Sequence, residues 1–436
     1  MIVKGKKCFF YLAIIIHLFL FLTSGITQNG IDSSLVGRGI TSIQIRGNAK
    51  TKPYIILREM KQQVGDELDL NLLELDRKRI QNLNLFNRVT IRAQGNDVQV
   101  QLFVLVEEKL YFFPYPILFI RERDWNKLSI GAGIRHLNFR GRAETINLRL
   151  WLGYNPAIQF SYSNPLIGGN RYFMTQVNFY CSQVRSKHFE EEINENHLGI
   201  EWILGKRFGY HTVSGIGLGY REITFSPPVY GQTLSSSGRD RLPSLNFFYT
   251  WDSRDLIKYP HEGFYISLFA KKTGLSDLSA NYFFTGFDIR QYFPLISDWT
   301  IAIRAKTHFS GGEIPLYDRV YLGYSERVRG HYFEQFEGEN MALASIAFRM
   351  FLIPVRYISL SNTSYLKNLK FGIGLGIFVD SGLTWFQGER IKRSMFHSGY
   401  GIGIHMHLPY IDIIRFELAF NEEGRSQLIV DLNVDI

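Results

Sequence analysis

The sequence predicts a mainly β protein, in which about sixteen antiparallel strands form a transmembrane barrel and one small β-α-α-β-β domain precedes it. Three observations support this fold class. Aromatic residues make up 15% of the 436 residues, with 35 Phe and 24 Tyr, as suits a barrel with aromatic girdles. The first residues have the composition of an export signal, and apolar and polar residues alternate along most of the chain after Leu110.

The N-terminal segment, residues 1–27, is expected to be a signal peptide. Three lysines precede an apolar run from Cys8 to Leu22, and the small residues Thr23-Ser24-Gly25 follow it. A membrane helix needs about 20 apolar residues, so this run is short for a span, and an uncleaved anchor is the alternative. Because no comparable apolar run follows residue 30, we expect the mature chain to cross the membrane with strands.

Charge and cysteine content exclude two classes of protein. Loss of Lys4, Lys6 and Lys7 with the signal lowers the formal net charge from +9 to +6. This charge is spread along the chain, so we expect no nucleic-acid partner. Cys181 would be the one remaining cysteine, which excludes a disulfide-stabilised fold.

Residues 38–110 predict a separate α/β domain. An alternating strand ends at Gly47, and a first helix is expected from Pro53, with Ile56, Met60 and Val64 on one face, until Gly65 ends it. A second amphipathic helix lies within Leu68–Phe86, and two alternating strands follow. An exposed edge of this sheet would bind extended peptides by adding them as a strand.

Residues 111–436 predict the barrel, because about sixteen alternating segments can be counted and an even number is usual for bacterial outer-membrane barrels. Near the C-terminus, Ile377 and Val379 share one face and Phe378 and Asp380 share the other. Apolar residues facing lipid and polar residues facing the lumen explain this pattern. A soluble β-sandwich is the alternative, but it would need no export.

The longest loop, Gly311 to Glu339, follows the eleventh predicted barrel strand. If the N-terminal domain lies in the periplasm, this loop is the sixth that faces outward. It contains the dense cationic and aromatic segment "GYSERVRGHYF", Gly323 to Phe333.

Four segments carry a family resemblance. The N-terminal domain, with "IQIRGNAKT" and "LNLFNRVTI", resembles a POTRA (polypeptide-transport-associated) domain. "WDSRDLIKYPHEGFYISL", "RVRGHYF" and "FGIGLGIFVDSGLTW" are similar to three barrel motifs of the BamA/TamA-type outer-membrane insertase and translocase superfamily, whose barrel is of the bacterial surface antigen type. Together these segments extend the resemblance over nearly the whole mature chain.

The resemblance implies that the sixth loop folds back into the lumen, where Arg329 pairs with Asp380 as a latch. Alternation independently places Asp380 inward, where an unpaired carboxylate would be costly and a guanidinium could bind both its oxygens. The implied latch residues are Val328, Arg329, Gly330 and Asp380, with Phe378 and Gly382 as supporting residues of the strand motif. His331 stands where the family motif usually has an aromatic residue.

The second motif is expected to fix a periplasmic turn. An ion pair or cap among Asp252, Arg254 and Asp255 would shape the turn, and Pro260 and Gly263 would begin the next strand. We expect this role to be structural.

The resemblance implies a non-enzymatic function without a cofactor or metal: insertion of β-barrel proteins into the outer membrane, or translocation of polypeptides across it. The partners would be unfolded outer-membrane or secreted polypeptides, the lipid bilayer and periplasmic accessory proteins. Clients would pair at the N-terminal domain and at the junction of the first and last barrel strands.

Three alternatives stay open at this point. One POTRA-like unit is fewer than the main essential insertase of this superfamily carries and fewer than the usual pair in two-partner secretion transporters, which indicates a specialised or accessory member. An exporter of the two-partner secretion type is the first alternative, and a passive pore is the second. The third is an outer-membrane enzyme, because His405 and His407 lie two apart on one strand and can share a metal. No third ligand is suggested by spacing, so a pair that only lines the lumen is the simpler interpretation.

Overall fold

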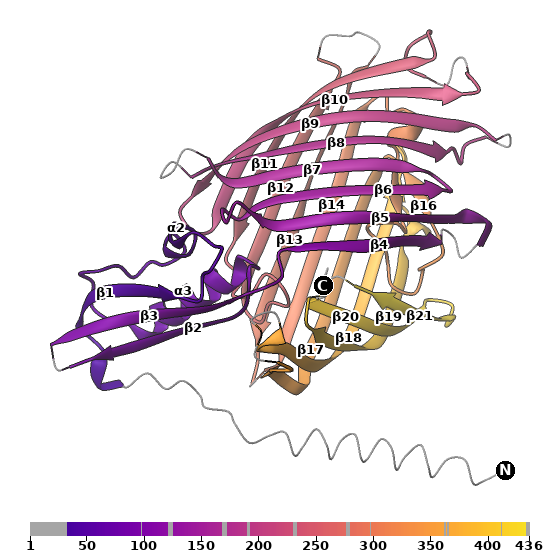
Figure 1. The fold of residues 1–436 in the computed structure, drawn as a ribbon. Coiled ribbons are helices and arrows are strands. Elements are labelled where there is room, and N and C mark those ends of the chain that lie inside the picture. The colour runs from indigo at the N-terminus through magenta and orange to yellow at the C-terminus, as the bar shows by residue number, and fades with distance from the viewer. Residues whose placement is uncertain are drawn as a thin grey trace.

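A computed structural model describes residues 33–432, apart from short gaps at 97, 121–124, 168–171, 190–191, 230–232, 276–279, 297, 362, 364–365 and 411. The predicted signal peptide, residues 1–27, lies outside the described residues. Figure 1 shows a small N-terminal domain beside one end of a large curved sheet. We call this the proximal end of the barrel and the opposite end the distal end.

The N-terminal domain has the predicted β-α-α-β-β order. Its elements are β1 (Gly39–Arg46), α2 (Pro53–Leu57), α3 (Leu70–Asn82), β2 (Phe86–Gly95) and β3 (Gln99–Glu108). The sheet order is β1-β3-β2, with β1 parallel to β3 and β2 antiparallel to it. One apolar cluster joins both helices to the sheet, including the fully buried Ile56, Ile80 and Leu102.

The first helix is shorter than the spacing of Ile56, Met60 and Val64 predicts. It ends at Leu57, and Val64 is exposed. The carboxylate of Asp76 on α3 accepts hydrogen bonds from the backbone N–H groups of Lys61 and Gln62 at 2.9 and 3.0 Å. These bonds hold the segment after Leu57 in a non-helical path, so a long-range contact overrides the helical period.

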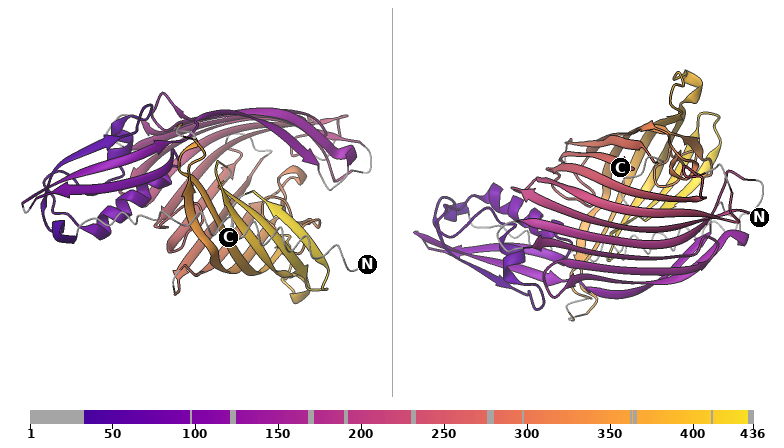
Figure 2. Two further views of the ribbon diagram at one scale, coloured as in Figure 1. Left: turned by 60° about the horizontal axis from the view of Figure 1, so that its bottom comes forward. Right: turned by 90° about the horizontal axis from the view of Figure 1, so that it is seen from above.

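Sixteen antiparallel strands form the barrel, which confirms the predicted fold class. Each strand pairs with the next in chain order, and Figure 2 shows the sheet curling from the first strand round to the last. The strands are β4 (Phe112–Ile120), β5 (Leu128–Phe139), β6 (Glu144–Gly153), β7 (Ala157–Ile167), β8 (Phe173–Arg185), β9 (Asn194–Phe208), β10 (Thr212–Ser226), β11 (Arg239–Asp252), β12 (Gly263–Thr273), β13 (Tyr282–Pro294), β14 (Thr300–Gly312), β17 (Asn340–Ile358), β18 (Leu369–Trp385), β19 (His397–Leu408), β20 (Asp412–Asn421) and β21 (Ser426–Asp431).

The alternation places apolar side chains outside and polar side chains inside. On β18, Ile377 and Val379 are about half exposed, whereas Phe378 and Asp380 are 2% and 3% exposed. On β20, Phe416 and Leu418 point outward, and Arg415 and Glu417 are buried. Among the described residues no helix has both the length and the apolar character of a membrane span.

Short 3₁₀ turns and one small hairpin complete the described structure. The 3₁₀ turns are Ser33–Leu35, Trp125–Lys127, Leu316–Asp318 and Arg393–Met395. The hairpin, β15 (Val320–Leu322) and β16 (Phe336–Gly338), belongs to the long loop between β14 and β17. This loop, residues 313–339, is called loop six below.

Candidate functional site

Loop six returns into the barrel and packs against its inner wall. Leu322 and Val328 are fully buried in a cluster with Met341 and Leu343 of β17. Gly382 on β18 makes room for this contact: a Cβ there would lie 2.9 Å from Leu322 Cδ2 and 3.1 Å from Val328 Cγ2. The loop is therefore an internal element of the barrel.

Arg329 lies at the tip of this internal segment and is bound by two carboxylates. Its Nε and Nη2 donate to the two carboxylate oxygens of Asp380, both at 2.7 Å, and its backbone N–H donates to Asp380 Oδ2 at 3.1 Å. Nη1 donates to Glu417 Oε1 at 3.0 Å, and Nη2 also donates to Ser345 Oγ at 3.1 Å. Burial alone would lower the pKa of Arg329, but Asp380 and Glu417 raise it above its ordinary value, so the guanidinium stays charged.

Phe378 and two glycines shape the space around Arg329. The guanidinium carbon lies 3.6 Å from the centre of the Phe378 ring, a cation–π contact in a site shielded from water. Gly330 has φ +105°, and a Cβ there would lie 2.6 Å from the carbonyl oxygen of Phe420. At Gly399 on β19 a Cβ would collide with the carbonyl oxygen of Arg329. Close approach of the loop backbone to the wall requires glycine at both positions.

Three further ion pairs anchor the same segment. Glu326 accepts from Lys306 Nζ of β14 at 2.7 Å and pairs with Arg304 Nη2 at 3.1 Å. Arg327 pairs with Asp431 of β21. Loop six therefore reaches β14 on one side and the last strand of the barrel on the other.

His331 is the next polar residue of the segment, and it is buried between two carboxylates. Nδ1 is hydrogen-bonded to Glu334, and Nε2 lies 2.6 Å from Glu422 Oε2 and 3.2 Å from the carbonyl oxygen of Ser398. Burial alone would lower the pKa of His331, but the hydrogen bonds to Glu334 and Glu422 raise it above its ordinary value. The histidine thus provides polar anchoring where an aromatic residue was expected.

The structure brings together all the residues predicted for the latch, and it adds partners that the sequence argument did not assign. Ser345, Glu417, Glu326 and Asp431 all contact the arginines of loop six or the wall beside it. The sequence pattern indicated one of these partners, because the alternation of apolar and polar residues on β20 already places Glu417 inward. Nothing in the spacing connects Glu417 to Arg329, which lies 88 positions earlier.

The predicted turn motif lies at the proximal end, far along the chain from the latch. Asp252 and Arg254 form a bidentate ion pair at 2.7 and 2.8 Å, and Asp255 accepts from the backbone N–H of His261 at 2.9 Å. Gly263 begins β12 with φ +108°, as expected, but Pro260 lies before the strand and not in it. The carbonyl oxygen of Pro260 accepts from Arg349 Nη2 at 2.6 Å, which holds it in the turn.

The same turn also binds the N-terminal domain. The side-chain amide of Asn82, at the end of α3, donates to the carbonyl oxygen of Asp255 at 2.9 Å and accepts from the backbone N–H of Ile257 at 3.0 Å. Lys78 lies 3.4 Å from the Asp255 carboxylate. The turn motif is therefore a contact between the two parts of the chain as well as a local structure.

Three other proximal turns hold the N-terminal domain. Arg207 of β9 makes a bidentate ion pair with Glu59 at 2.7 and 2.8 Å. The amide of Asn368, before β18, donates to the Glu107 carboxylate, and Lys52 N–H donates to the Gly141 carbonyl at 2.9 Å. Contacts at four turns spread around the rim place the domain across the proximal end of the barrel.

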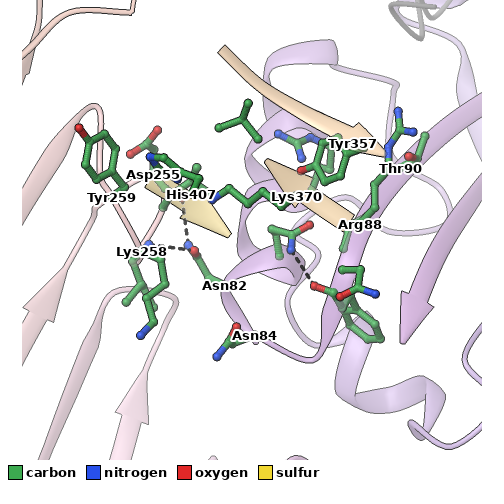
Figure 3. Close-up of a pocket in the computed structure, with 18 of the residues that line it drawn as sticks. Asn82, Asn84, Arg88, Thr90, Asp255, Lys258, Tyr259, Tyr357, Lys370 and His407 are labelled. Carbon is green, nitrogen blue, oxygen red and sulfur yellow. Dashed lines mark hydrogen bonds between the residues drawn. The ribbon is translucent and has the colours of Figure 1, made fainter. Parts of the chain in front are cut away.

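A cavity of about 920 Å³ lies between the domain and the rim. Figure 3 shows residues of α3, β2, the turn after β11 and the ends of β17 to β19 around it. Its lining has more basic side chains (Arg77, Arg88, Lys109, Lys258 and Lys370) than acidic ones (Glu74, Asp255 and Asp298), so its net charge is positive. The edge strand β2 contributes Val89, Thr90 and Ile91. The cavity could accept an extended segment with acidic side chains beside the β2 edge.

The two inward histidines of β19 contact Tyr259 in this region. Tyr259 Oη is 2.9 Å from His405 Nδ1, and its ring is 4.7 Å from that of His407. Within the described parts of the chain, the one group of three or more residues that could hold a metal ion is His331, His397 and Glu422, at the distal end. Among the described residues, the structure therefore adds no third metal ligand to His405 and His407, as the alternative of a metal enzyme would need.

The first and last barrel strands are both edges. In the described residues, β4 pairs only with β5 and β21 pairs only with β20. We call the junction of these two edges the seam. Their unpaired backbone groups need partners in a membrane, because lipid offers none.

Comparisons with known proteins agree with this architecture. Residues 138–429 match the Omp85 superfamily domain, and residues 39–109 match the surface antigen variable number repeat, a POTRA domain. BamA from Haemophilus ducreyi lacking POTRA domains 1–3 is 17% identical, with a TM-score of 0.53 over 90% of this chain and 83% of that one. CdiB from Escherichia coli is 11% identical, with a TM-score of 0.60 over 92% and 75%. CdiB from Acinetobacter baumannii is 13% identical, with a TM-score of 0.55 over 91% and 73%.

At these identities the three solved structures show the fold alone, whereas the match to the family model covers most of the chain. The chain belongs to the Omp85 superfamily of outer-membrane proteins, and its POTRA domain lies in the periplasm.

Proposed function

We propose that this protein inserts β-barrel proteins into the outer membrane by offering the edges of its seam to client strands. Omp85 proteins handle polypeptide clients in the outer membrane, either as BamA-like insertases or as CdiB-like exporters. The observation that favours insertion is the seam itself, where β4 and β21 have no mutual ladder in the described residues. A client strand that pairs there satisfies backbone groups that lipid would leave unpaired.

The composition of β4 also favours a seam that opens. β4 contains Pro114 and Pro116, and proline is tolerated in a sheet at an edge where its nitrogen faces away from the neighbouring strand. The two prolines are two residues apart, so both missing donors fall on the same side of β4. Because β5 pairs along the whole of β4, we assign that side to the seam. A seam with two fewer donors closes weakly and exchanges partners readily.

The interior of the barrel argues against export through the lumen as the main activity. Loop six lies inside the wall and is bound by Asp380, Glu417, Lys306 and Asp431. The POTRA domain contacts four turns at the periplasmic rim. A polypeptide that crossed the lumen would have to displace both elements, whereas a strand added at the seam displaces neither.

The POTRA domain provides the first binding site for the client. Its sheet has β1 and β2 as edges, and β2 borders the cationic cavity at the rim. An extended client could add to β2 through backbone hydrogen bonds, with its acidic side chains near Arg88 and Lys370. Transfer from this edge to the seam would keep the client's backbone paired at each stage.

A reversible lock on the seam tests the proposal. Cysteines at Leu118 of β4 and Val430 of β21, both on the lipid-facing side, would be joined by a disulfide or a short bismaleimide in a Cys181→Ser background. Insertion of a urea-unfolded outer-membrane barrel into proteoliposomes is measured by its heat-dependent gel shift. The matched control joins Leu218 and Leu245, which are paired lipid-facing residues of β10 and β11.

The locked seam is expected to lose most insertion activity, and reduction of the disulfide should restore it. The β10–β11 lock should leave insertion unchanged. Full insertion by a chain with a completely locked seam would overturn the proposal. A separate test is to deplete this protein from cells. If one secreted protein then disappears from the medium while outer-membrane barrel proteins are unaffected, the result would favour the exporter.

A further inference from the structure

Three segments meet at the distal end and place two imidazoles and one carboxylate together. His331 comes from loop six, His397 begins β19, and Glu422 lies in the turn between β20 and β21. One ligand atom from each lies within 4.8 Å of the other two. His331 Nε2 is 2.6 Å from Glu422 Oε2, and His397 Nδ1 is 3.9 Å from Glu422 Oε1.

We propose that His331, His397 and Glu422 bind one divalent transition-metal ion of the Zn²⁺ class. Imidazole nitrogen and carboxylate oxygen are the usual ligands of this ion, at about 2.0–2.2 Å. Ligand atoms on a tetrahedral ion with such bonds lie about 3.3 Å apart. The present spacings bracket that value, so small side-chain movements would close the site.

The surroundings hold both imidazoles in place. Glu334 is hydrogen-bonded to Nδ1 of His331, which leaves Nε2 to face Glu422 and His397. A carboxylate on the second nitrogen is the usual way to orient a metal-bound histidine. The ring of His397 stacks on Phe336 at 3.4 Å with an angle of 10° between the planes. The stack fixes the ring, so less side-chain entropy is lost when an ion binds.

The site is accessible to an ion from outside. The side chain of His331 is 5% exposed, whereas those of His397 and Glu422 are 23% and 43% exposed. A buried ligand on one side and two accessible ligands on the other leave a fourth position for water. This is the arrangement of an open site, and a closed structural site would have four protein ligands.

The bound ion would tie loop six to the last hairpin of the barrel. Arg327 of the same loop already pairs with Asp431 on β21, so the ion would be a second link to the strand that borders the seam. We infer that the ion stabilises the closed seam from the cell exterior. This consequence rests on the proposed function, whereas the metal site itself does not.

Metal binding is measured on the full chain in detergent micelles, purified without a polyhistidine tag and treated with a chelator. Zn²⁺ alone is titrated by calorimetry into the wild type, His397→Ala and Glu422→Gln. The matched control is His197→Ala, which removes a histidine that lies 3.1 Å from Glu195 but outside the cluster. Thermal unfolding of each metal-free variant checks that the fold is kept.

The wild type and His197→Ala are expected to bind one ion with equal affinity. Each ligand variant should lose at least about tenfold in affinity, because loss of a residue that only orients a metal ligand already costs about 10–100-fold. Zn²⁺ should also slow tryptic cleavage after Arg327 in the wild type. Affinity weaker than about 1 mM, or equal affinity in all four proteins, would overturn the proposal. If Zn²⁺ binds as expected but does not change client insertion, the metal site stands and only its proposed effect on the seam is overturned.

Discussion

Arg329 and Asp380 are 51 positions apart in the sequence, yet they are joined by two hydrogen bonds of 2.7 Å inside the barrel. A third bond, from the Arg329 backbone N–H, fixes the main chain of the loop to the same carboxylate. The pair therefore positions the backbone of loop six as well as one side chain. Glu417, Ser345 and the Phe378 ring complete the binding site of the guanidinium.

Asp380→Asn should detach loop six from the wall. The substitution removes one partner of a buried ion pair, a change that typically costs about 3–5 kcal/mol. We expect faster tryptic cleavage within loop six and a lower midpoint of urea unfolding in micelles. The exposed pair Glu423–Arg425 is a control, because Glu423→Gln should change stability by less than about 0.5 kcal/mol. A chain that carries Arg329→Asp and Asp380→Arg should recover part of the loss, and no recovery would indicate that orientation matters more than charge.

Gly399→Ala should displace the same loop without altering any charge. The added Cβ would collide with the carbonyl oxygen of Arg329, which cannot move without breaking the bonds to Asp380. Gly217→Ala on β10 is the matched control, since its Cβ would have no neighbour closer than 3.3 Å and none of its three nearest atoms belongs to loop six. Hydrogen exchange of loop-six amides measures the effect. Equal protection in the two variants would contradict the close contact.

Pro114→Thr combined with Pro116→Thr should strengthen the seam. Each substitution restores a backbone donor on the side of β4 that we assign to β21, worth about 0.5–1.5 kcal/mol per hydrogen bond formed. We expect a higher yield of disulfide between cysteines at 118 and 430, and slower client insertion. Leu148→Thr on the lipid-facing side of β6 controls for the change in apolarity. Unchanged cross-linking would show that the proline nitrogens do not face the seam.

Glu59→Gln should loosen the POTRA domain from the barrel rim. The change weakens the bidentate pair with Arg207, in which each of the two hydrogen bonds to a charged group is worth about 1.5–3 kcal/mol. Spin labels on the POTRA domain and the rim should report a broader distance distribution. The exposed Arg239, 3.5 Å from Glu222, supplies the control Arg239→Gln, which should leave the distribution narrow. The same narrow distribution in Glu59→Gln would mean that the other three turns suffice for docking.

The chemistry of the candidate site was partly predictable. Alternation on β18 places Asp380 inward, and the resemblance in "RVRGHYF" pairs it with Arg329. The remaining members of the site come from separate strands: Ser345 from β17, Glu417 from β20 and Asp431 from β21. No local pattern links them, because their proximity depends on register across several strands. The cluster of His331, His397 and Glu422 has the same origin, and its spacing of 66 and 25 positions is unlike any local metal motif.

The sequence by itself determined the order of the helices and strands of the POTRA domain, the number of barrel strands, and the side of the wall on which the alternating residues of the last strands lie. These properties follow from local periods, two residues for a strand and about 3.6 for a helix, together with turn residues. Only the tertiary structure decided which inward residues meet, where the POTRA domain docks and that α2 stops at Leu57. The physical reason is that a period specifies the face of an element but not its neighbour. The carboxylates of Asp76 and Asp380 find their partners only after the chain has brought distant segments together.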